Sequence, residues 1–262
     1  MTPFMNVERI GARLGAAALG CALVSFTSFA AAEEPGHHWS YHGNTGPTHW
    51  GALEHEFSTC GLGKHQSPID IKSVAVKKAA LGAIKFDYKP STLKIINNGH
   101  TIQINYDPGS TITVGGKQYE LVQFHFHRPS EEKIDGKSFD MVAHLVHKDS
   151  SGNLAVVAVL VRSGQSNSLI ATLWSHLPQE KGVEQLVANT QIDAARLLPS
   201  DRAYYTFTGS LTTPPCSEDV TWFVLRDPMQ FSKQEVARFA KLYPMNARPV
   251  QPLNGRLVET SP

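Results

Sequence analysis

Three histidines within a short stretch of the chain have the spacing of a metal site. In QFHFH, His125 and His127 are two residues apart, so on a β-strand their side chains point to the same face as that of Gln123. The phenylalanines between them point to the opposite face. The later stretch AHLVH alternates in the same way and holds His144. We expect the two stretches to pair as antiparallel strands, because Asp135-Gly136 between them is typical of a turn.

Three neutral imidazoles with a fourth position open are typical of a catalytic zinc site, whereas structural zinc sites are usually closed by four ligands and favour thiolates. No cysteine lies near these histidines in the sequence. The alternative is that HxH marks two partly buried histidines at a hairpin edge, without any metal. The spacing alone leaves both interpretations open.

The residues around the histidines resemble the active-site core of the α-class carbonic anhydrases. Further motifs of that family follow in its order along the chain: HHWSY, GPTHW, QSPIDI, NNGH, QFHFH, SE, AHLVH, GSLTTPPC, VTWFVL and NARPVQPLNGR. The resemblance implies an enzyme that reversibly hydrates carbon dioxide to bicarbonate and a proton. Its cofactor would be Zn²⁺ on His125, His127 and His144, and zinc-bound hydroxide would attack the substrate.

The resemblance also implies roles for residues beyond the zinc ligands. Thr212 would accept a hydrogen bond from the hydroxide and donate its own proton to Glu131, which aims the hydroxide. His100 would carry the released proton away, since an imidazole titrates near neutral pH. Other polar residues would order the water molecules between zinc and His100: Tyr41, Asn98 and Gln103.

Carbon dioxide is small and apolar, so its site should be an apolar wall beside the hydroxide. Val146 lies two residues beyond His144 and therefore on the same strand face. Thr213 would contact the bicarbonate product. By resemblance the wall consists of Val146, Val156, Leu211 and Trp222, although each could equally be ordinary core. Ester hydrolysis would be a side activity, since zinc hydroxide attacks other carbonyl groups too.

The chain departs from the family in the surroundings of His144. A metal-bound histidine usually donates its second N–H to an acceptor that fixes the ring, and Gln123 can accept from His125 in this way. In the family a glutamate two residues before the third ligand commonly accepts from that ligand, but this chain has Val142 there. We therefore expect His144 to use another acceptor, a water molecule or none, and zinc to be held less tightly.

Residues 1–32 are predicted to be a secretory signal peptide, cleaved near residues 30–32. Arg9 and Arg13 precede an apolar run, Leu14–Ala30, that is too short and too rich in small residues to span a membrane. We expect an exported protein in the periplasm, with no spanning segment after processing. Secretion, or a lipid anchor through Cys21, is the alternative.

The remaining residues, 33–262, fit one catalytic domain. The chain is 41% hydrophobic and 18% charged, and its net charge of +1 gives no electrostatic reason to expect nucleic acid as a partner. Its partner would be the small substrate, and the sequence leaves a homodimer open. Cys60 and Cys216 would reach an oxidising compartment, where the resemblance favours a disulfide over two free thiols. The bridge would tether the Leu211–Pro215 loop.

Patterns typical of strands dominate the middle of the chain, and the apolar run Leu154–Val161 is typical of a central strand buried on both faces. Helices are expected around Ser168–Leu177, around Asp193–Leu198 and from Ser232, where a capping box with Glu235 begins a helix to Leu242. The fold class is mostly β (α+β). The resemblance implies a large, twisted, mainly antiparallel central sheet with short peripheral helices, and cis peptides at Ser67-Pro68 and Pro214-Pro215.

Three other functions compete with this one. A cupin-type oxygenase would use His125, His127 and Glu131 as ligands, but the flanking glycines fall at the wrong offsets. A metalloprotease would need HExxH, which is absent. A family member that has lost catalysis would be a binding module, for which only Val142 argues.

Overall fold

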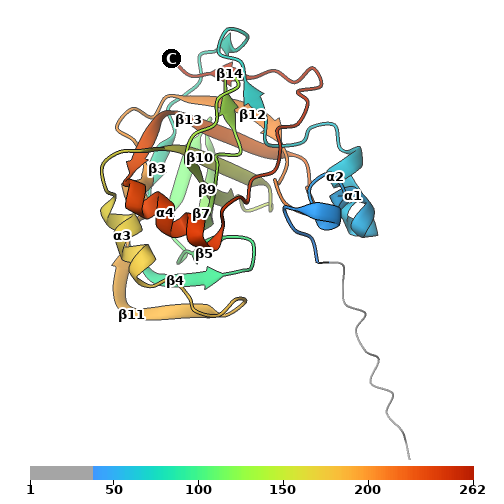
Figure 1. The fold of residues 1–262 in the computed structure, drawn as a ribbon. Coiled ribbons are helices and arrows are strands. Elements are labelled where there is room, and N and C mark those ends of the chain that lie inside the picture. The colour runs from blue at the N-terminus through green and yellow to red at the C-terminus, as the bar shows by residue number, and fades with distance from the viewer. Residues whose placement is uncertain (1–37) are drawn as a thin grey trace, which may run out of the picture. The chain divides into compact units, whose positions relative to one another are not determined.

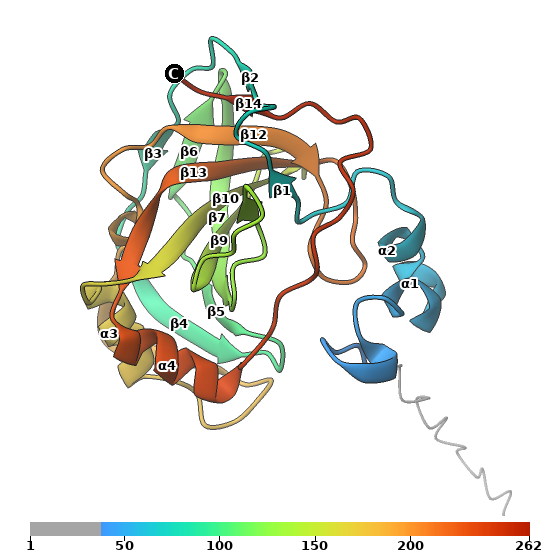
Figure 2. The ribbon, with the colours of Figure 1, turned by 45° about the horizontal axis from the view of Figure 1, so that its top comes forward.

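The framework of the protein is a twisted sheet of 12 strands, seen in a computed structural model that describes residues 38–262 (Figures 1 and 2). The predicted signal peptide and Cys21 lie outside the described residues. The order is β11-β4-β5-β7-β9-β10-β13-β12-β14-β2, with β6 also beside β7 and β3 beside β6. The strands are β2 (Lys77–Lys78), β3 (Lys85–Asp87), β4 (Ser91–Asn97), β5 (Ile102–Asn105), β6 (Thr111–Val114), β7 (Lys117–His127), β9 (Met141–Lys148), β10 (Leu154–Ser163), β11 (Glu184–Ile192), β12 (Tyr204–Gly209), β13 (Val220–Phe231) and β14 (Glu259–Thr260).

The predicted fold class is confirmed, with two local exceptions to antiparallel pairing. Strands β10 and β13 run parallel, as do β14 and β2. A separate pair, β1 (Asp70–Ile71) and β8 (Lys133–Ile134), is also parallel. The helices are short and lie around the sheet: α1 (Trp50–Leu53), α2 (Thr59–Leu62), α3 (Ser168–Ser175) and α4 (Lys233–Leu242), with 3-10 turns η1 (Gly43–Thr45), η2 (His55–Phe57) and η3 (Ala194–Leu197).

Strands β7, β9 and β10 lie at the centre of the sheet, and an apolar cluster packs on each of the two faces of the sheet. On one face Phe124 and Phe126 of β7 pack in a core that α3 and α4 cover, where the rings of Trp174 and Phe239 stack 5.8 Å apart. On the other face the alternate residues of β9 and β10 join a second apolar cluster around Trp222. The prediction that Leu154–Val161 is buried on both faces is confirmed.

Pairing of β7 with β9 is antiparallel, as predicted, and sets His125 directly opposite His144. Asp135 and Gly136 form the expected turn, with φ of 51° and 81°. This turn closes only a small loop between Ile134 and Lys137 rather than joining the two strands directly. The residues between β7 and that loop, which include Glu131, are therefore free to fold back toward the histidines.

The helix predictions hold with one adjustment. The capping box of α4 is present, with Ser232 accepting from the Glu235 N–H and the Glu235 side chain accepting from the Ser232 N–H. Around Asp193–Leu198 the helix is only the 3-10 turn η3, capped by Asp193. Strand β11 had no sequence prediction, because its exposed edge position leaves little apolar alternation. Among the described residues, no helix has both the length and the apolar character needed to cross a membrane.

The predicted disulfide between Cys60 and Cys216 is confirmed, and so are both predicted cis peptides. A third cis peptide, Arg128-Pro129, had not been expected. The disulfide joins α2 to the loop that follows β12. Its two cysteines pack against the rings of Tyr41 and Trp50, so the bridge ties the N-terminal segment to the loop that carries Thr212.

Removing this bridge should destabilise the fold. We expect the double variant Cys60→Ala, Cys216→Ala to lose about 2–5 kcal/mol of unfolding free energy, because the cross-link spans 156 residues and restricts the unfolded chain. Urea denaturation of both proteins measures the difference, and alkylation with and without reductant checks by mass that the wild type carries the bridge. Equal unfolding midpoints would contradict the expectation.

Candidate metal centre

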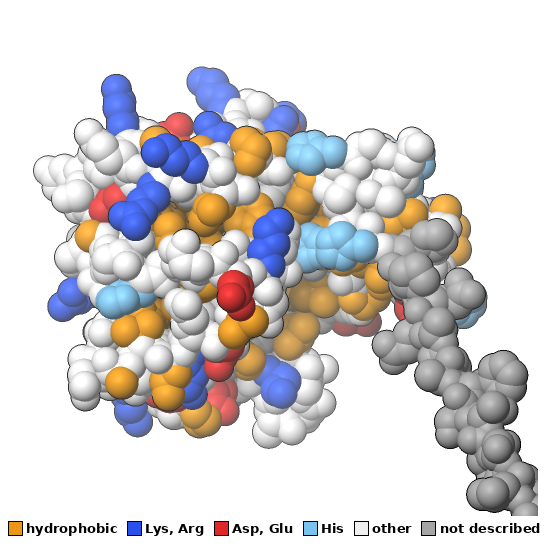
Figure 3. Space-filling view, turned by 60° about the horizontal axis from the view of Figure 1, so that its bottom comes forward, with side chains coloured by type: hydrophobic (Ala, Val, Ile, Leu, Met, Phe, Trp, Pro, Cys, Tyr) orange, Lys and Arg blue, Asp and Glu red, His pale blue; other side chains and the backbone are white. Residues whose placement is uncertain are grey.

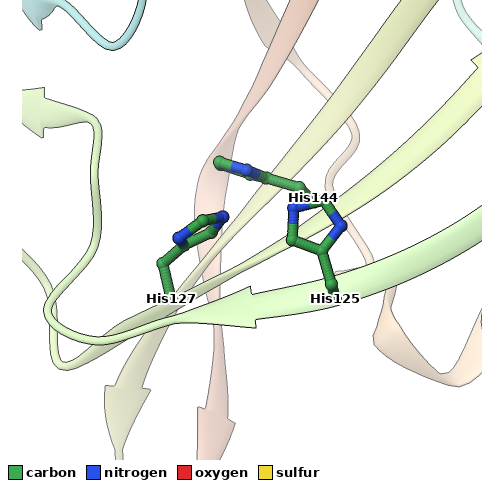
Figure 4. A group of neighbouring side chains, drawn as sticks. All are labelled: His125, His127 and His144. Atoms are coloured by element: carbon green, nitrogen blue, oxygen red, sulfur yellow. The ribbon is translucent and has the colours of Figure 1, made fainter. Parts of the chain in front are cut away.

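Three imidazoles meet on the face of the sheet opposite α3 and α4. His125 and His127 come from β7 and His144 from β9, and one nitrogen of each lies within 4.8 Å of those of the others (Figure 4). The ring centroids are 5.0 Å apart for His125 and His127, and 4.7 Å apart for His127 and His144. The strand alternation expected from the sequence therefore brings all three rings together.

The second nitrogen of each ring is already held by an acceptor. His125 Nδ1 donates to Gln123 Oε1 at 2.8 Å, as the sequence suggested, and His127 Nδ1 donates to the backbone oxygen of Asn246 at 2.7 Å. His144 donates through Nε2 to Glu132. Because an acceptor oxygen fixes the tautomer, the nitrogens left with lone pairs are Nε2, Nε2 and Nδ1, and these are the atoms that face one another.

The acceptor of His144 settles a question that the sequence left open. Glu132 Oε1 and Oε2 lie 3.1 and 3.2 Å from His144 Nε2, and Glu132 is fully buried. Val142, in contrast, belongs to the apolar cluster. His144 therefore has a charged acceptor after all, from the loop rather than from its own strand, and the expectation of looser metal binding loses its basis.

A metal fits the unsatisfied atoms of the centre. His127 Nε2 is buried and, among the described residues, has no hydrogen-bond partner. Burial lowers the pKa of His125 to about 3, and burial also lowers the pKa of His127. Both rings are therefore neutral near pH 7 and can offer a lone pair. Burial acts in the same direction on His144, but the neighbouring carboxylates of Glu132 and Glu131 outweigh it and raise the pKa of His144. Three imidazole nitrogens without thiolate or ligating carboxylate suit zinc or a similar divalent transition metal.

Glu131 lies beside the three rings rather than in solvent. Its Oε1 accepts from the Arg248 N–H at 2.7 Å, and its buried Oε2 lies 3.5 Å from His127 Nε2. Burial raises the pKa of Glu131 to about 7. The Thr212 hydroxyl approaches closely enough to oppose that rise, but the contact lacks the geometry of a hydrogen bond. The predicted donation from Thr212 to Glu131 stays a prediction.

A cavity of about 190 Å³ opens beside the histidines. It is small, and four of the nine side chains that line it are apolar. The predicted wall residues and both threonines all line it, together with the two histidines that face it: Val146, Val156, Leu211, Trp222, Thr212, Thr213, His125, His144 and Gln123. A small uncharged molecule in this cavity would lie next to the open side of the metal position.

His100 packs against the N-terminal segment. Its ring stacks on that of Trp39, with centroids 3.6 Å apart and planes 8° apart, and on His38 at 4.9 Å. Partial burial, followed by the nearby charges of His38 and Lys181, lowers the pKa of His100 to about 4. In this packed position the ring is a weak proton acceptor at neutral pH.

The three predicted water-ordering residues are polar groups near His100, His125 and Trp39: Asn98 accepts from the His100 N–H, and the Tyr41 ring packs against Trp39. Asn98 Nδ2 donates to Gln103 Oε1 at 3.3 Å, and Gln103 lies opposite His125 in the β5–β7 register. The Tyr41 hydroxyl is buried and has no protein partner among the described residues. These groups leave donors and acceptors for water, but the path itself stays a prediction.

Two residues that hold the rings were missed from the sequence. Glu132 had no role in the sequence prediction, and its only signal was its place directly after Glu131. Asn246 acts through its backbone oxygen, which no side-chain pattern reveals. Its own side chain fixes that position by donating to the backbone oxygens of His100 and Phe126, both at 3.0 Å.

Known proteins share both sequence and structure with this chain. A model of the eukaryotic-type carbonic anhydrase family matches residues 45–262. The carbonic anhydrase of Neisseria gonorrhoeae is 45% identical over 90% of this chain and 93% of its own length, and that of a Nostoc species is 44% identical over 84% of each. A hyperthermostable carbonic anhydrase from a hydrothermal vent chimney superimposes with a TM-score of 0.83 at 48% identity, covering 86% of this chain and all of that chain.

The converging nitrogens predict one metal ion per chain. We expect the chelator-stripped protein to bind one equivalent of zinc, and His125→Ala to weaken binding by more than the ~10–100-fold that loss of an acceptor alone causes, because a ligand itself is gone. Competition with a chromogenic chelator measures both affinities. The exposed His65→Ala serves as the control variant; equal affinity in all three proteins would contradict the site.

Proposed function

Because this chain belongs to the α-class, or eukaryotic-type, carbonic anhydrase family, we propose that it hydrates carbon dioxide with zinc held by His125, His127 and His144. The family is one of zinc-dependent lyases. The observation that carries the proposal for this chain is the convergence of three lone-pair nitrogens whose partner nitrogens are each engaged by an acceptor. Zinc, when bound, would supply the Lewis acidity that makes water a nucleophile near neutral pH.

Thr212 and Glu131 would orient the attacking oxygen. In the proposed arrangement the Thr212 hydroxyl accepts from that oxygen and donates to Glu131 Oε2, the buried atom that lacks a partner among the described residues. Donation of this kind requires the carboxylate to be ionised, and the Arg248 N–H on Oε1 favours the ionised form. Thr212 then has one lone-pair direction left, so the oxygen is aimed into the cavity.

The apolar wall would hold the substrate without hydrogen bonds. Val146, Val156, Leu211 and Trp222 line the cavity beside the open side of the proposed zinc position. A wall of this kind suits carbon dioxide and gives bicarbonate, which is charged, little to bind to. Thr213 at the same cavity would contact the product. Ester hydrolysis is the proposed side activity.

His100 would take the proton out of the site. In its stack on Trp39 the ring has a lowered pKa, so we propose that it accepts a proton after turning away from Trp39 toward the opening, where water restores an ordinary imidazole pKa. Tyr41, Asn98 and Gln103 would order water between the two positions. Periplasmic export is proposed with this function, and the disulfide fits an exported protein.

The proposal is tested by following carbon dioxide hydration with a pH indicator. We expect the zinc-loaded protein to accelerate proton release, a chelator to abolish the acceleration, and added zinc to restore it. Thr212→Val should lower the rate by ~10²-fold or more, as removal of one positioned donor does elsewhere. A folded, zinc-loaded protein without hydration activity would support the binding-module alternative instead.

The shuttle is tested separately. We expect His100→Ala to lower turnover in weak buffer by ~100-fold, the lower end of what a positioned acid–base group contributes, and added imidazole buffer to restore it by carrying the proton in its place. The exposed His49→Ala is the control. Unchanged turnover of His100→Ala in weak buffer would assign the proton path to other groups.

A further inference from the structure

We infer that Glu132 is the positioning residue for His144, and that it makes metal retention depend on the loop after β7. The inference rests on the proposed function only in taking the three histidines as the metal ligands. The observation behind it is a buried carboxylate with one side-chain partner. Glu132 is fully buried, and the only side chain of the described residues that its carboxylate hydrogen-bonds is His144, at 3.1 and 3.2 Å.

Burying a carboxylate is costly unless it is paired, so its partner accounts for its position. The ring of His144 lies between two consecutive acids, with Nε2 on Glu132 and Nδ1 3.8 Å from Glu131 Oε2. The acceptor on Nε2 therefore decides which nitrogen carries the proton. With Nε2–H donating to Glu132, Nδ1 keeps its lone pair toward His125 and His127.

Glu132 differs in charge from the other two acceptors. His125 donates to an amide oxygen and His127 to a backbone oxygen, both neutral. A carboxylate acceptor makes an imidazole more basic and so a stronger metal ligand. His144 is thus the ligand whose metal bond should be most sensitive to its acceptor.

Position 142 could supply the same carboxylate from the strand. It lies two residues before His144 and so on the same face of β9, and its valine packs in the apolar cluster on that face. In this chain the loop position 132 holds the carboxylate that accepts from His144, and the strand position 142 holds an apolar side chain. A glutamate at position 142 should therefore replace Glu132 only when Glu132 is absent, because two neighbouring buried carboxylates repel each other.

The experiment is a swap, read out as zinc release from the folded holo-protein to a chelator. We expect Glu132→Gln, which keeps an acceptor oxygen, to lower zinc affinity about 10-fold and Glu132→Val about 100-fold. Val142→Glu alone should bring no gain, whereas the double variant Glu132→Val, Val142→Glu should recover most of the loss. Glu235→Gln, which removes another buried carboxylate at the start of α4, is the matched control and should leave zinc affinity unchanged.

Thermal unfolding of the metal-free proteins separates positioning from a structural role. Glu132→Gln should leave the metal-free midpoint unchanged or raised while zinc affinity falls. Wild-type affinity in Glu132→Gln and Glu132→Val, or the same loss in Glu235→Gln, overturns the inference. If the double variant does not fold, the Glu132→Gln result decides. A wild type that binds no zinc would instead reject the proposed function.

Discussion

The register between β7 and β9 is the constraint on which the site depends. Side chains alternate along a strand, so a slip of one residue would turn His144 toward the core and a hydrophobic residue toward His125. The two faces of these strands prevent that slip. Phe124 and Phe126 are fully buried against the helices on one face, and burying them there leaves the histidines on the other. Packing of the apolar core therefore sets the β7–β9 register, and that register places the three histidines on one face.

The groups that hold the rings come from distant parts of the chain. Gln123 shares a strand with its histidine, Glu132 follows in a loop, and Asn246 comes from the segment after α4. Arg248, from that same segment, connects Glu131 to Gln66 and to the backbone of Cys60. The centre can thus be complete only when the C-terminal segment has packed. On the face seen in Figure 3, basic and acidic side chains are spread among hydrophobic and other uncharged ones.

Much of this arrangement could be predicted from the sequence, because strand alternation is local. The central strands, the β7–β9 pairing, the capping box of α4 and the convergence of three histidines follow from periodicity and turn residues. The motifs of the family supplied the cysteine pairing and the cavity residues. What could not be predicted was settled by tertiary position: the acceptor for His144, the backbone oxygen of Asn246, and the stacking of His100 on Trp39. Edge strand β11 was not predicted, because most of its side chains are exposed and the strand has little apolar alternation.

The disulfide between Cys60 and Cys216 holds the loop that carries Thr212 but does not join the strands that carry the three histidines. The histidines lie on the central strands, whereas Thr212 lies four residues before a cysteine that is bonded to α2. Protein made in a reducing cytosol would therefore keep the strands that carry the histidines, whereas the loop that we propose aims the nucleophile would no longer be bonded to α2. Under the proposed function, zinc content and specific activity report on different parts of the site, and a thiol reagent should change activity more than zinc content.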